Sequence, residues 1–549
     1  MVWIVWWWGS IHSIPEVRGQ IVPLGRGWSI STTVIATTTT STTTTMFERC
    51  VEENHQSLFT FSRIYRAYLN CRKHKRNSKD ALIFELNLEE NLVQLVESLR
   101  DRSYQPATSV CFYVSKPKMR EIFAADFKDR IVHHLNYELL APVWEKIFID
   151  QSFACRPEKG THHAAKVLQK YLRKITCNGK RPAFYLKMDV KNFFISINKH
   201  LLYKMIIKKC HSEEIRWLLK VIIFHDPTED YQLKSSKTLQ QKVPQQKSLF
   251  HVLEDCGLPI GNLTSQFFAN IFLNALDQFV KHVLNCRYYV RYVDDFILLS
   301  VDKNQLLEWK SQIIQFLADE LLLQINEKAT RLDSIYNGVD FVGFIVRPFY
   351  MLCRRRVIGN MKSALRKYQQ KLVKQTDQVR IWNYDSISLE RLLATMNSYL
   401  GHLSHAHTRN VIKKVCQDFS FLREYYILTY RKLIRKYDYP KAFKNIRQQI
   451  HYFSSRFRDQ IVIFQIGCYY ETYGQSAERL SQLLNYKLRK GWRGMNRACG
   501  FHQRFLNSVC CKLETDGISF VVIKQTGKYL KNIMERFPSF RVEIISATS

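Results

Sequence analysis

The chain has 549 residues, 46% of them hydrophobic and 13% aromatic, which is enough apolar side chain to bury several cores. Its 82 Lys and Arg outnumber 48 Asp and Glu, and the formal net charge of +34 favours a polyanionic partner such as nucleic acid, although ribosomal, membrane-surface and heparin-binding proteins share this balance. The 14 cysteines form no CxxC pair, which argues against a zinc site or a disulfide framework and favours a reducing, cytoplasmic compartment.

The first 45 residues differ in composition from the rest of the chain. Residues 1–8 are apolar, but they are short for a signal peptide and lack a basic region. Residues 31–45 are a Thr-rich, low-complexity run that cannot form a packed core. We predict that residues 1–45 are disordered or lie upstream of the true start, with Met46 as the initiator and a membrane-binding tip as the alternative. No stretch approaches the roughly 18–20 apolar residues that span a bilayer, so no membrane partner is expected.

Helical spacing dominates from Met46 to about Arg102. The apolar positions recur about every 3.6 residues and include Leu82, Phe84, Leu86, Leu92, Val93, Leu95 and Val96. A short strand is predicted at residues 109–114, before Pro117 removes a backbone donor. Residues 183–188 form a second apolar strand, which ends on Asp189.

The middle of the chain alternates between polar and apolar segments. The Gln- and Lys-rich residues 226–250 predict an exposed insertion, and residues 264–280 predict a helix with one apolar face. Residues 287–300 predict two strands joined at a tight polar turn. Residues 351–450 are basic and helical, with one apolar stripe made of Leu389, Leu392, Leu393, Met396, Leu400 and Leu403. The pattern then changes to strand–helix–strand, which places a domain boundary near 455–460.

The sharpest chemical feature is the pair Asp294 and Asp295 at the predicted hairpin turn. Adjacent carboxylates between apolar strands repel each other and are costly to desolvate, and bound divalent cations offset that cost. Asp189 supplies a third carboxylate, with Val190 beside it as a further metal ligand. Such a group can hold two Mg²⁺ ions about 4 Å apart for phosphoryl transfer, and Mn²⁺ accepts the same oxygen ligands. For the tetrapeptide YVDD alone, a solvated hairpin turn remains the alternative.

The surrounding blocks carry a family resemblance. From about residue 60 to 450 the chain resembles the reverse transcriptases of group II introns, retrons and diversity-generating retroelements. The matching blocks are, in order, SKPKMREIFAADFKDRIVHH (115–134), FIDQSFACRPEKGTHHA (148–164), YLKMDVKNFF (185–194), GLPIGNLTSQFFANIFLN (257–274), YVDD (292–295), LQINEKAT (323–330) and GVDFVGF (338–344). The resemblance implies an α/β (α+β) right-hand polymerase with fingers, palm and helical thumb, in which the three aspartates are catalytic.

The same resemblance implies roles for single residues. Lys116 and Arg120 match positions that grip the incoming triphosphate, with a solvated strand end as the alternative. Arg156 lies in a block that shapes the nucleotide pocket, and a structural ion pair is equally compatible. Phe194 matches the bulky position that excludes a ribose 2′-hydroxyl, unless it is a core Phe, and Lys328 matches a lysine near the leaving pyrophosphate.

The thumb that the resemblance implies is basic and would follow the backbone of a nucleic-acid duplex. Arg354, Arg355, Arg366 and Lys367 are its predicted nucleic-acid contacts, and a solvated amphipathic bundle is the alternative.

The block around Ile260 discriminates within the family. Most reverse transcriptases carry a Gln-Gly…Ser-Pro pattern here, whereas those of diversity-generating retroelements resemble the Ile260-Gly261…Ser265-Gln266 found in this chain. That resemblance implies copying of a template RNA with frequent errors opposite adenine, after which the cDNA diversifies a target gene. An aliphatic Ile260 cannot make the hydrogen bonds of a Gln amide, which would leave the base-pair pocket less constrained; simple core packing is the alternative for Ile260.

The C-terminal segment resembles a different family. Residues 461–474, 496–503 and 517–525 are similar to the N-terminal mismatch-recognition domain of MutS repair proteins. The family's Phe-x-Glu wedge corresponds to Tyr469 and Glu471, and a tyrosine can still stack on bases. Cys468, where an Asp is usual, and the Tyr both depart from the family's pattern, so a generic duplex-binding domain is the alternative to a mismatch sensor.

These inferences predict fingers and palm over 46–350, a thumb over 351–455 and a MutS-like domain over 458–549. The predicted function is an RNA-directed DNA polymerase of a diversity-generating retroelement, in a bacterial or phage setting. Alternatives are a group II intron or retron enzyme and a non-catalytic RNA-binding assembly protein. Expected partners are template RNA, the primer and cDNA duplex, deoxynucleoside triphosphates, and a small basic accessory protein that the C-terminal domain would otherwise replace.

Overall fold

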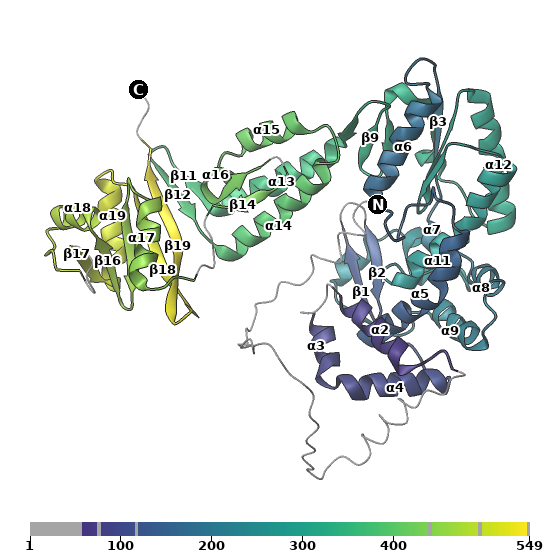
Figure 1. The fold of residues 1–549 in the computed structure, drawn as a ribbon, viewed down its shortest axis with the longest axis horizontal. Helices are drawn as coiled ribbons and strands as arrows, with labels where there is room; N and C mark the ends of the chain where they lie inside the picture. Colours follow the sequence, from purple (N-terminus) through teal and green to yellow (C-terminus); the bar gives the residue numbers. More distant parts are fainter. Residues whose placement is uncertain are drawn as a thin grey trace, which may run out of the picture. The chain divides into compact units, whose positions relative to one another are not determined.

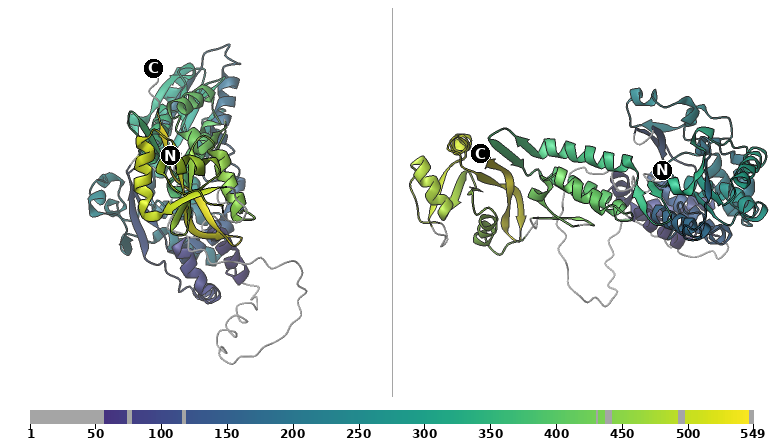
Figure 2. Two further views of the ribbon diagram at one scale, coloured as in Figure 1. Left: turned by 90° about the vertical axis from the view of Figure 1, so that its left-hand side faces the viewer. Right: turned by 90° about the horizontal axis from the view of Figure 1, so that it is seen from above.

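The computed structural model describes residues 57–73, 78–115, 119–429, 431–436, 442–491 and 497–545. They form two compact units, which divide between Val342 and Tyr350. The predicted low-complexity segment 1–45 lies outside the described residues. Figures 1 and 2 show the helices and strands of each unit. Among the residues described, no helix is long and apolar enough to cross a lipid bilayer.

The first unit begins with a helical cluster. Its helices are α2 (Phe61–Arg72), α3 (Lys79–Leu86), α4 (Leu88–Arg100) and α5 (Phe127–Ile147). Their apolar faces share one core that includes Phe59, Val96 and Ile131. The sequence predicts Leu82 and Leu86 on the apolar face, but both are exposed. The reason is that the predicted helix is interrupted at Asn87, so that α3 and α4 are separate helices with different buried faces.

A small sheet follows the helical cluster. It contains β1 (Ser109–Val114), β2 (Arg120–Ala124) and β4 (Tyr231–Leu233) in the order β2-β1-β4. The predicted exposed insertion over 226–250 is therefore only partly exposed: β4 pairs with β1, and Leu249 is buried. The remainder of the insertion forms short turns of helix, namely α10 (Lys237–Gln240), η2 (Gln245–Lys247) and η3 (Leu249–His251).

The centre of the first unit is an antiparallel sheet in the order β5-β6-β3-β7. Its strands are β3 (Phe184–Asp189), β5 (Tyr289–Tyr292), β6 (Asp295–Ser300) and β7 (Arg331–Ser334). The two strands predicted in 287–300 are confirmed as β5 and β6. The buried Arg291 on β5 makes ion-pair contacts of 2.7 and 2.5 Å with Asp277 on a neighbouring helix, which locks this strand in place.

Helices cover this sheet and provide most of its core. They are α6 (Thr161–Ile175), α7 (Phe193–Ser196), α8 (Lys199–Ile207), α9 (Glu213–Phe224), α11 (Leu263–Gln278) and α12 (Lys303–Leu321). Helix α12 packs against β3 and β6, and α6 packs against β5 and β6. Short elements finish the unit: η4 (Phe279–Val283), η5 (Glu327–Ala329), η6 (Ile335–Asn337), β8 (Val339–Phe341) and β9 (Phe344–Val346), the last of which runs across the division.

The first part of the second unit is the helical segment predicted over residues 351–450. It contains β10 (Met351–Cys353), α13 (Arg355–Leu372), α14 (Ser386–Leu403), α15 (Arg409–Asp418), α16 (Leu422–Tyr425) and α17 (Ile446–Arg456). The predicted apolar stripe is buried at Leu392, Met396, Leu400 and Leu403. Two hairpins interrupt the helices, formed by β11 (Val373–Gln375) with β12 (Val379–Asn383) and by β13 (Tyr426–Leu428) with β14 (Leu433–Arg435).

The C-terminal part is a twisted mixed sheet. Its elements are β15 (Ile461–Ile466), β16 (Tyr469–Tyr473), α18 (Gln475–Leu484), β17 (Ala498–His502), η8 (Gln503–Phe505), α19 (Leu506–Thr515), β18 (Phe520–Leu530) and β19 (Ile533–Ile544). The strand–helix–strand pattern predicted here is confirmed. Residues of α18 and α19 pack against the sheet in one core that includes Ile463, Leu480 and Val522.

One sheet joins the two parts of the second unit. Its order is β11-β12-β19-β18-β15-β16-β17, so the hairpin that follows α13 pairs with the last strand of the C-terminal domain. The Trp382 indole N–H donates to Glu543 at 2.8 Å across this pairing. The predicted thumb and MutS-like segments, which the sequence treats as neighbours, therefore share backbone hydrogen bonds between β12 and β19.

Candidate active site

The β5–β6 turn presents two carboxylates. Tyr292 and Asp295 are register partners, so Val293 and Asp294 form the turn between them. Val293 has φ of 57°, a left-handed conformation that is rare for a β-branched residue and costs roughly 1–3 kcal/mol. Burial of both strands holds this strained turn in place, because Tyr292 and Phe296 are both part of the core.

The third carboxylate comes from the neighbouring strand. Asp189 ends β3 and stands opposite Asp295 in the β3–β6 register. The Val190 backbone N–H donates to the Asp294 carbonyl at 3.2 Å, which ties the end of β3 to the turn. The sheet thus brings the three predicted catalytic aspartates to one edge.

Each of the two flanking carboxylates has a polar neighbour. The Asn326 amide donates to Asp189 Oδ2 at 3.1 Å, and its backbone N–H donates to the Asp189 carbonyl at 2.8 Å. The Lys187 ammonium lies 3.0 Å from Asp295 Oδ2 and donates to the Asp340 carbonyl at 2.8 Å. Asn326 lies in the LQINEKAT block and Lys187 in YLKMDV, but the sequence predictions included neither residue.

Asp294 is the aspartate whose charged form is most disfavoured by its surroundings. Burial, followed by the charges of Asp189 and Asp295, raises the pKa of Asp294 to about 8, against the opposing effect of Arg120. Its Oδ1 atom is buried with no hydrogen-bond partner. A buried carboxyl oxygen without a donor is a site where a cation would recover the lost solvation.

The donor set suits a hard divalent cation, since it consists of carboxylate oxygens and the neighbouring backbone. Within the ranges that the structure describes, no three His, Cys, Asp or Glu side chains are gathered to hold a metal ion as they stand. Lys187 contacts one oxygen of Asp295, and Asn326 contacts one oxygen of Asp189. Reverse transcriptases generally use divalent metal ions, and these residues fit that chemistry once those two contacts yield.

Three basic residues are predicted to contact the triphosphate, and the structure describes two of them. Arg120 begins β2, where burial lowers the pKa of its guanidinium while the charge of Asp294 raises it. Lys116 lies outside the described residues. Lys328 is exposed in η5. All three roles stay predictions.

Arg156 forms the structural ion pair that was the alternative to a nucleotide contact. Its guanidinium lies 2.9 Å from Glu145 and donates to the carbonyls of Ile149 at 2.6 Å and Ser152 at 3.0 Å, and its side chain is only 5% exposed. It also lies over the ring of Phe148. These contacts tie Arg156 to the surrounding protein, and a direct contact with nucleotide stays a prediction.

The proposed selectivity residues lie on two separate segments. Phe194 is half-buried in α7, and its ring contacts that of Phe193. Ile260 is also half-buried, and its carbonyl accepts the Phe123 backbone N–H at 3.0 Å. At Gly261, with φ of 141°, a Cβ atom would lie 2.5 Å from the Phe123 carbonyl oxygen, so only glycine fits against β2.

Gln266 occupies the first turn of α11. The Cys155 thiol lies 2.9 Å from its side-chain oxygen as a donor, and burial raises the pKa of that thiol to about 11. The neutral thiol therefore orients the Gln266 amide. This contact joins two of the predicted blocks, 148–164 and 257–274.

In the second unit, the predicted basic contacts follow α13. Arg355, Arg366 and Lys367 are exposed on the helix, and Arg354 caps its N-terminus in a half-buried position. Arg355 and Arg366 are eleven positions apart, close to three helical turns, so they lie on one face. This spacing suits contacts along a phosphate backbone.

The predicted wedge lies on β16, between β15 and the edge strand β17 of the C-terminal sheet. Tyr469, the first residue of β16, is 50% exposed, and its ring contacts His502 on β17. Glu471 follows on the same strand face and accepts a hydrogen bond from the Tyr473 hydroxyl. The exposed tyrosine is available for stacking, whereas Glu471 already has a partner.

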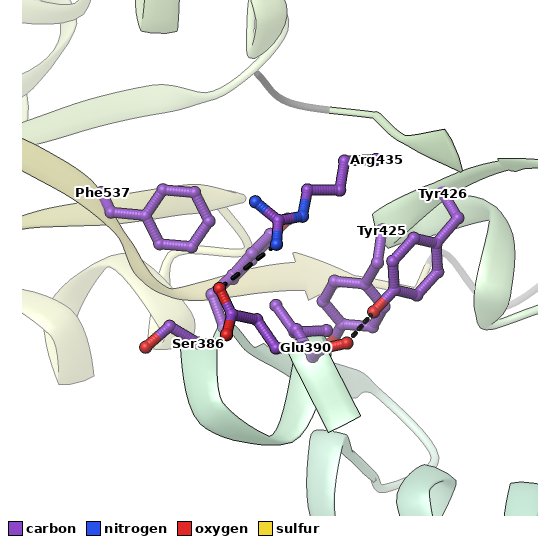
Figure 3. Close-up of a pocket in the computed structure, with 8 residues that line it drawn as sticks. Ser386, Glu390, Tyr425, Tyr426, Arg435 and Phe537 are labelled. Atoms are coloured by element: carbon purple, nitrogen blue, oxygen red, sulfur yellow. Dashed lines mark hydrogen bonds and ion pairs between the residues drawn. The ribbon is translucent and has the colours of Figure 1, made fainter. Parts of the chain in front are cut away.

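A separate pocket opens between α14, the β13–β14 hairpin and β19 (Figure 3). It is lined by Tyr384, Ser386, Leu389, Glu390, Tyr425, Tyr426, Arg435 and Phe537. The Tyr426 hydroxyl donates to the Leu389 carbonyl at 2.6 Å, and Arg435 lies 3.2 Å from Glu390. None of the predicted site residues lines this pocket.

Comparison with known proteins identifies both regions. Residues 114–346 match the family described as reverse transcriptase (RNA-dependent DNA polymerase), and residues 444–542 match MutS domain I. Protein YkfC of Escherichia coli K12 is 24% identical over 298 residues, covering 47% of this chain and 72% of YkfC. The group II intron-encoded protein LtrA of Lactococcus lactis subsp. cremoris is 21% identical over 374 residues, covering 54% of this chain and 58% of LtrA.

Two solved telomerase structures show a weak similarity to this chain. Apo telomerase from Candida tropicalis, truncated from the C-terminal domain, has a TM-score of 0.33 and 14% identity over 47% of this chain and 59% of that one. Telomerase from Candida albicans, in complex with a fragment of telomeric RNA, has a TM-score of 0.31 and 15% identity over 58% of each chain.

The family match and the geometry together confirm the coarser predictions. Residues 114–346 form a reverse transcriptase domain, an RNA-directed DNA polymerase in a right-hand fold of mixed helices and strands. The C-terminal segment contains a MutS domain I.

Proposed function

We propose that this chain is the error-prone reverse transcriptase of a diversity-generating retroelement. It copies a template RNA into cDNA, and its MutS-like domain binds the product duplex. The observation that carries the catalytic part is the convergence of Asp189, Asp294 and Asp295 at one sheet edge. The retroelement assignment rests on the block Ile260-Gly261…Ser265-Gln266, which resembles that subfamily.

The metal part of the proposal names two Mg²⁺ ions, with Mn²⁺ as a substitute. Asp189, Asp294, Asp295 and the Val190 backbone carbonyl would hold them. When bound, the ions would lower the pKa of the primer 3′-hydroxyl and neutralise charge on the triphosphate. The chain's own contribution is to hold the carboxylates together and to place Arg120 beside the triphosphate, where its fixed charge needs no reorganisation.

The base-pair pocket supports the error-prone part. The Ile260 carbonyl accepts the Phe123 backbone N–H, and Gly261 permits that close approach, so the backbone at Ile260 is held against β2. An apolar group there offers no hydrogen bond that would favour one base pair over another. The partly buried Phe194 is proposed to exclude the ribose 2′-hydroxyl.

The group II intron type is the second candidate, because the similarity to LtrA favours it. Primer extension on an RNA template, followed by sequencing of the products, separates the candidates. Errors concentrated opposite adenine, reduced in Ile260→Gln, support the retroelement assignment. Uniform low error supports the intron type. Synthesis by Asp294→Ala equal to that of the unsubstituted chain would refute the catalytic assignment, and binding without synthesis would indicate an RNA-binding assembly protein.

The C-terminal domain is proposed to replace the small basic accessory protein. The shared sheet supports this role, because β12 and β19 link the basic helix α13 to the domain that carries Tyr469. Tyr469→Ala should weaken binding to duplex, whereas Tyr469→Phe should keep it, since stacking needs only the ring. If mismatched and matched duplexes bind equally, the domain is a generic duplex binder.

A further inference from the structure

Lys187 contacts one of the three aspartates of the proposed metal site. Lys187 precedes Asp189 by two positions on β3, so both side chains leave the same face of the strand. Its ammonium lies 3.0 Å from Asp295 Oδ2, and both side chains are only 15% exposed. An ion pair so far from solvent is weakly screened, so the contact is stronger than a surface pair.

A second contact fixes the ammonium at this place. Lys187 donates to the backbone carbonyl of Asp340 on β8 at 2.8 Å, so its position does not depend on Asp295 alone. The ammonium thus contacts both the Asp295 carboxylate and the Asp340 backbone carbonyl. The positive charge beside Asp295 therefore belongs to a side chain of the sheet itself, the Lys187 ammonium.

Two basic side chains lie near the aspartates. The Lys187 ammonium lies 3.0 Å from Asp295 Oδ2, and the positive charge of Arg120 acts on Asp294, so both offset part of the negative charge of the site. A metal ion entering this site has to compete with the ammonium for Asp295. The same ammonium also repels the ion after it has bound.

We propose that Lys187 is a resident counter-cation of the active site, a positioning residue that holds Asp295 when no metal is bound and is displaced from it when a divalent cation enters. Lys187 thereby keeps the site folded without metal and sets a weaker metal affinity than three uncompensated carboxylates would have. This inference rests on the proposed metal site.

The first test compares Mn²⁺ binding to the full chain by electron paramagnetic resonance. Lys187→Met should bind Mn²⁺ about tenfold more tightly than the unsubstituted chain, and Lys187→Arg, which keeps the charge, should change it less. In EDTA, Lys187→Met should melt at a lower temperature, and Mn²⁺ should restore the loss. The matched control is Lys310→Met, which removes the partly exposed Lys310–Glu327 pair and should leave Mn²⁺ affinity unchanged.

The second measurement needs no variant, so a folding defect cannot obscure it. Acetylation of lysines in the unsubstituted chain is followed by mass spectrometry with and without Mn²⁺. Lys187 should become several-fold more reactive with Mn²⁺, while Lys310 stays unchanged. Equal affinity in Lys187→Met, or unchanged labelling of Lys187, would overturn the inference while leaving the metal site intact. Absence of Mn²⁺ binding by the unsubstituted chain would instead refute the proposed metal site.

Discussion

Replacing Asp294 with Asn should stabilise the metal-free protein while abolishing DNA synthesis. Asn has nearly the same shape but no charge to bury, and Asp294 Oδ1 has no hydrogen-bond partner to lose. The shift of the Asp294 pKa from 3.8 to about 8 corresponds to about 6 kcal/mol at about 1.36 kcal/mol per unit. Relaxation of the turn and entry of water reduce that value, so we expect a gain of about 2–4 kcal/mol.

The gain has a defined pH window. Because the folded-state pKa of Asp294 is raised, its burial costs nothing below about pH 4, where the folded and unfolded chains both carry the proton. The cost grows as the unfolded chain releases that proton, and it reaches its full value above about pH 8. The stability advantage of Asp294→Asn should therefore rise with pH across this interval.

The assay is thermal unfolding of the full chain in EDTA, at several pH values. At pH 8.5 the variant should melt about 4–8 °C higher than the unsubstituted chain, and the difference should shrink toward pH 5. With saturating Mg²⁺ the order of the two melting temperatures should reverse, because only the unsubstituted chain gains metal-binding free energy from the Asp294 carboxylate. A variant that melts at or below the unsubstituted chain at pH 8.5 in EDTA would refute the electrostatic reasoning.

Three further changes test other parts of the molecule. Phe194→Val should raise ribonucleotide incorporation at least about tenfold in primer extension, and unchanged sugar selectivity would remove Phe194 from the pocket. Gly261→Ala should lower both the melting temperature and the activity, because its Cβ would lie 2.5 Å from the Phe123 carbonyl, and a neutral effect would show that β2 can yield. Arg355→Ala with Arg366→Ala should weaken RNA–DNA duplex binding and reduce its salt-dependence slope by about two, whereas an unchanged slope would place the duplex elsewhere.

Motifs along the chain were enough to predict the reverse transcriptase domain and the three aspartates that the central sheet brings together. The alternation of apolar residues around YVDD predicts a hairpin, and carboxylates at its turn and at the end of another strand predict a metal site. Both segments are short and local, so their structure follows from nearby residues. The strand–helix–strand pattern of the C-terminal domain was likewise readable from its own sequence.

Contacts between distant segments could not be read in this way. Lys187 is an ordinary strand lysine in the sequence, and only the β3–β6 register places its ammonium beside Asp295. Arg156 resembles a pocket residue, yet Glu145 and two backbone carbonyls on neighbouring segments take up its guanidinium.

The same limit applies to the organisation of the second unit. Nothing in residues 373–383 indicates that this hairpin pairs with β19 at the far end of the chain. Composition, local spacing and motif order determined the chemistry, the main helices and strands, and the family resemblance. Strand register and side-chain pairing, which depend on which surfaces meet after the chain has folded, were decided only by the tertiary structure.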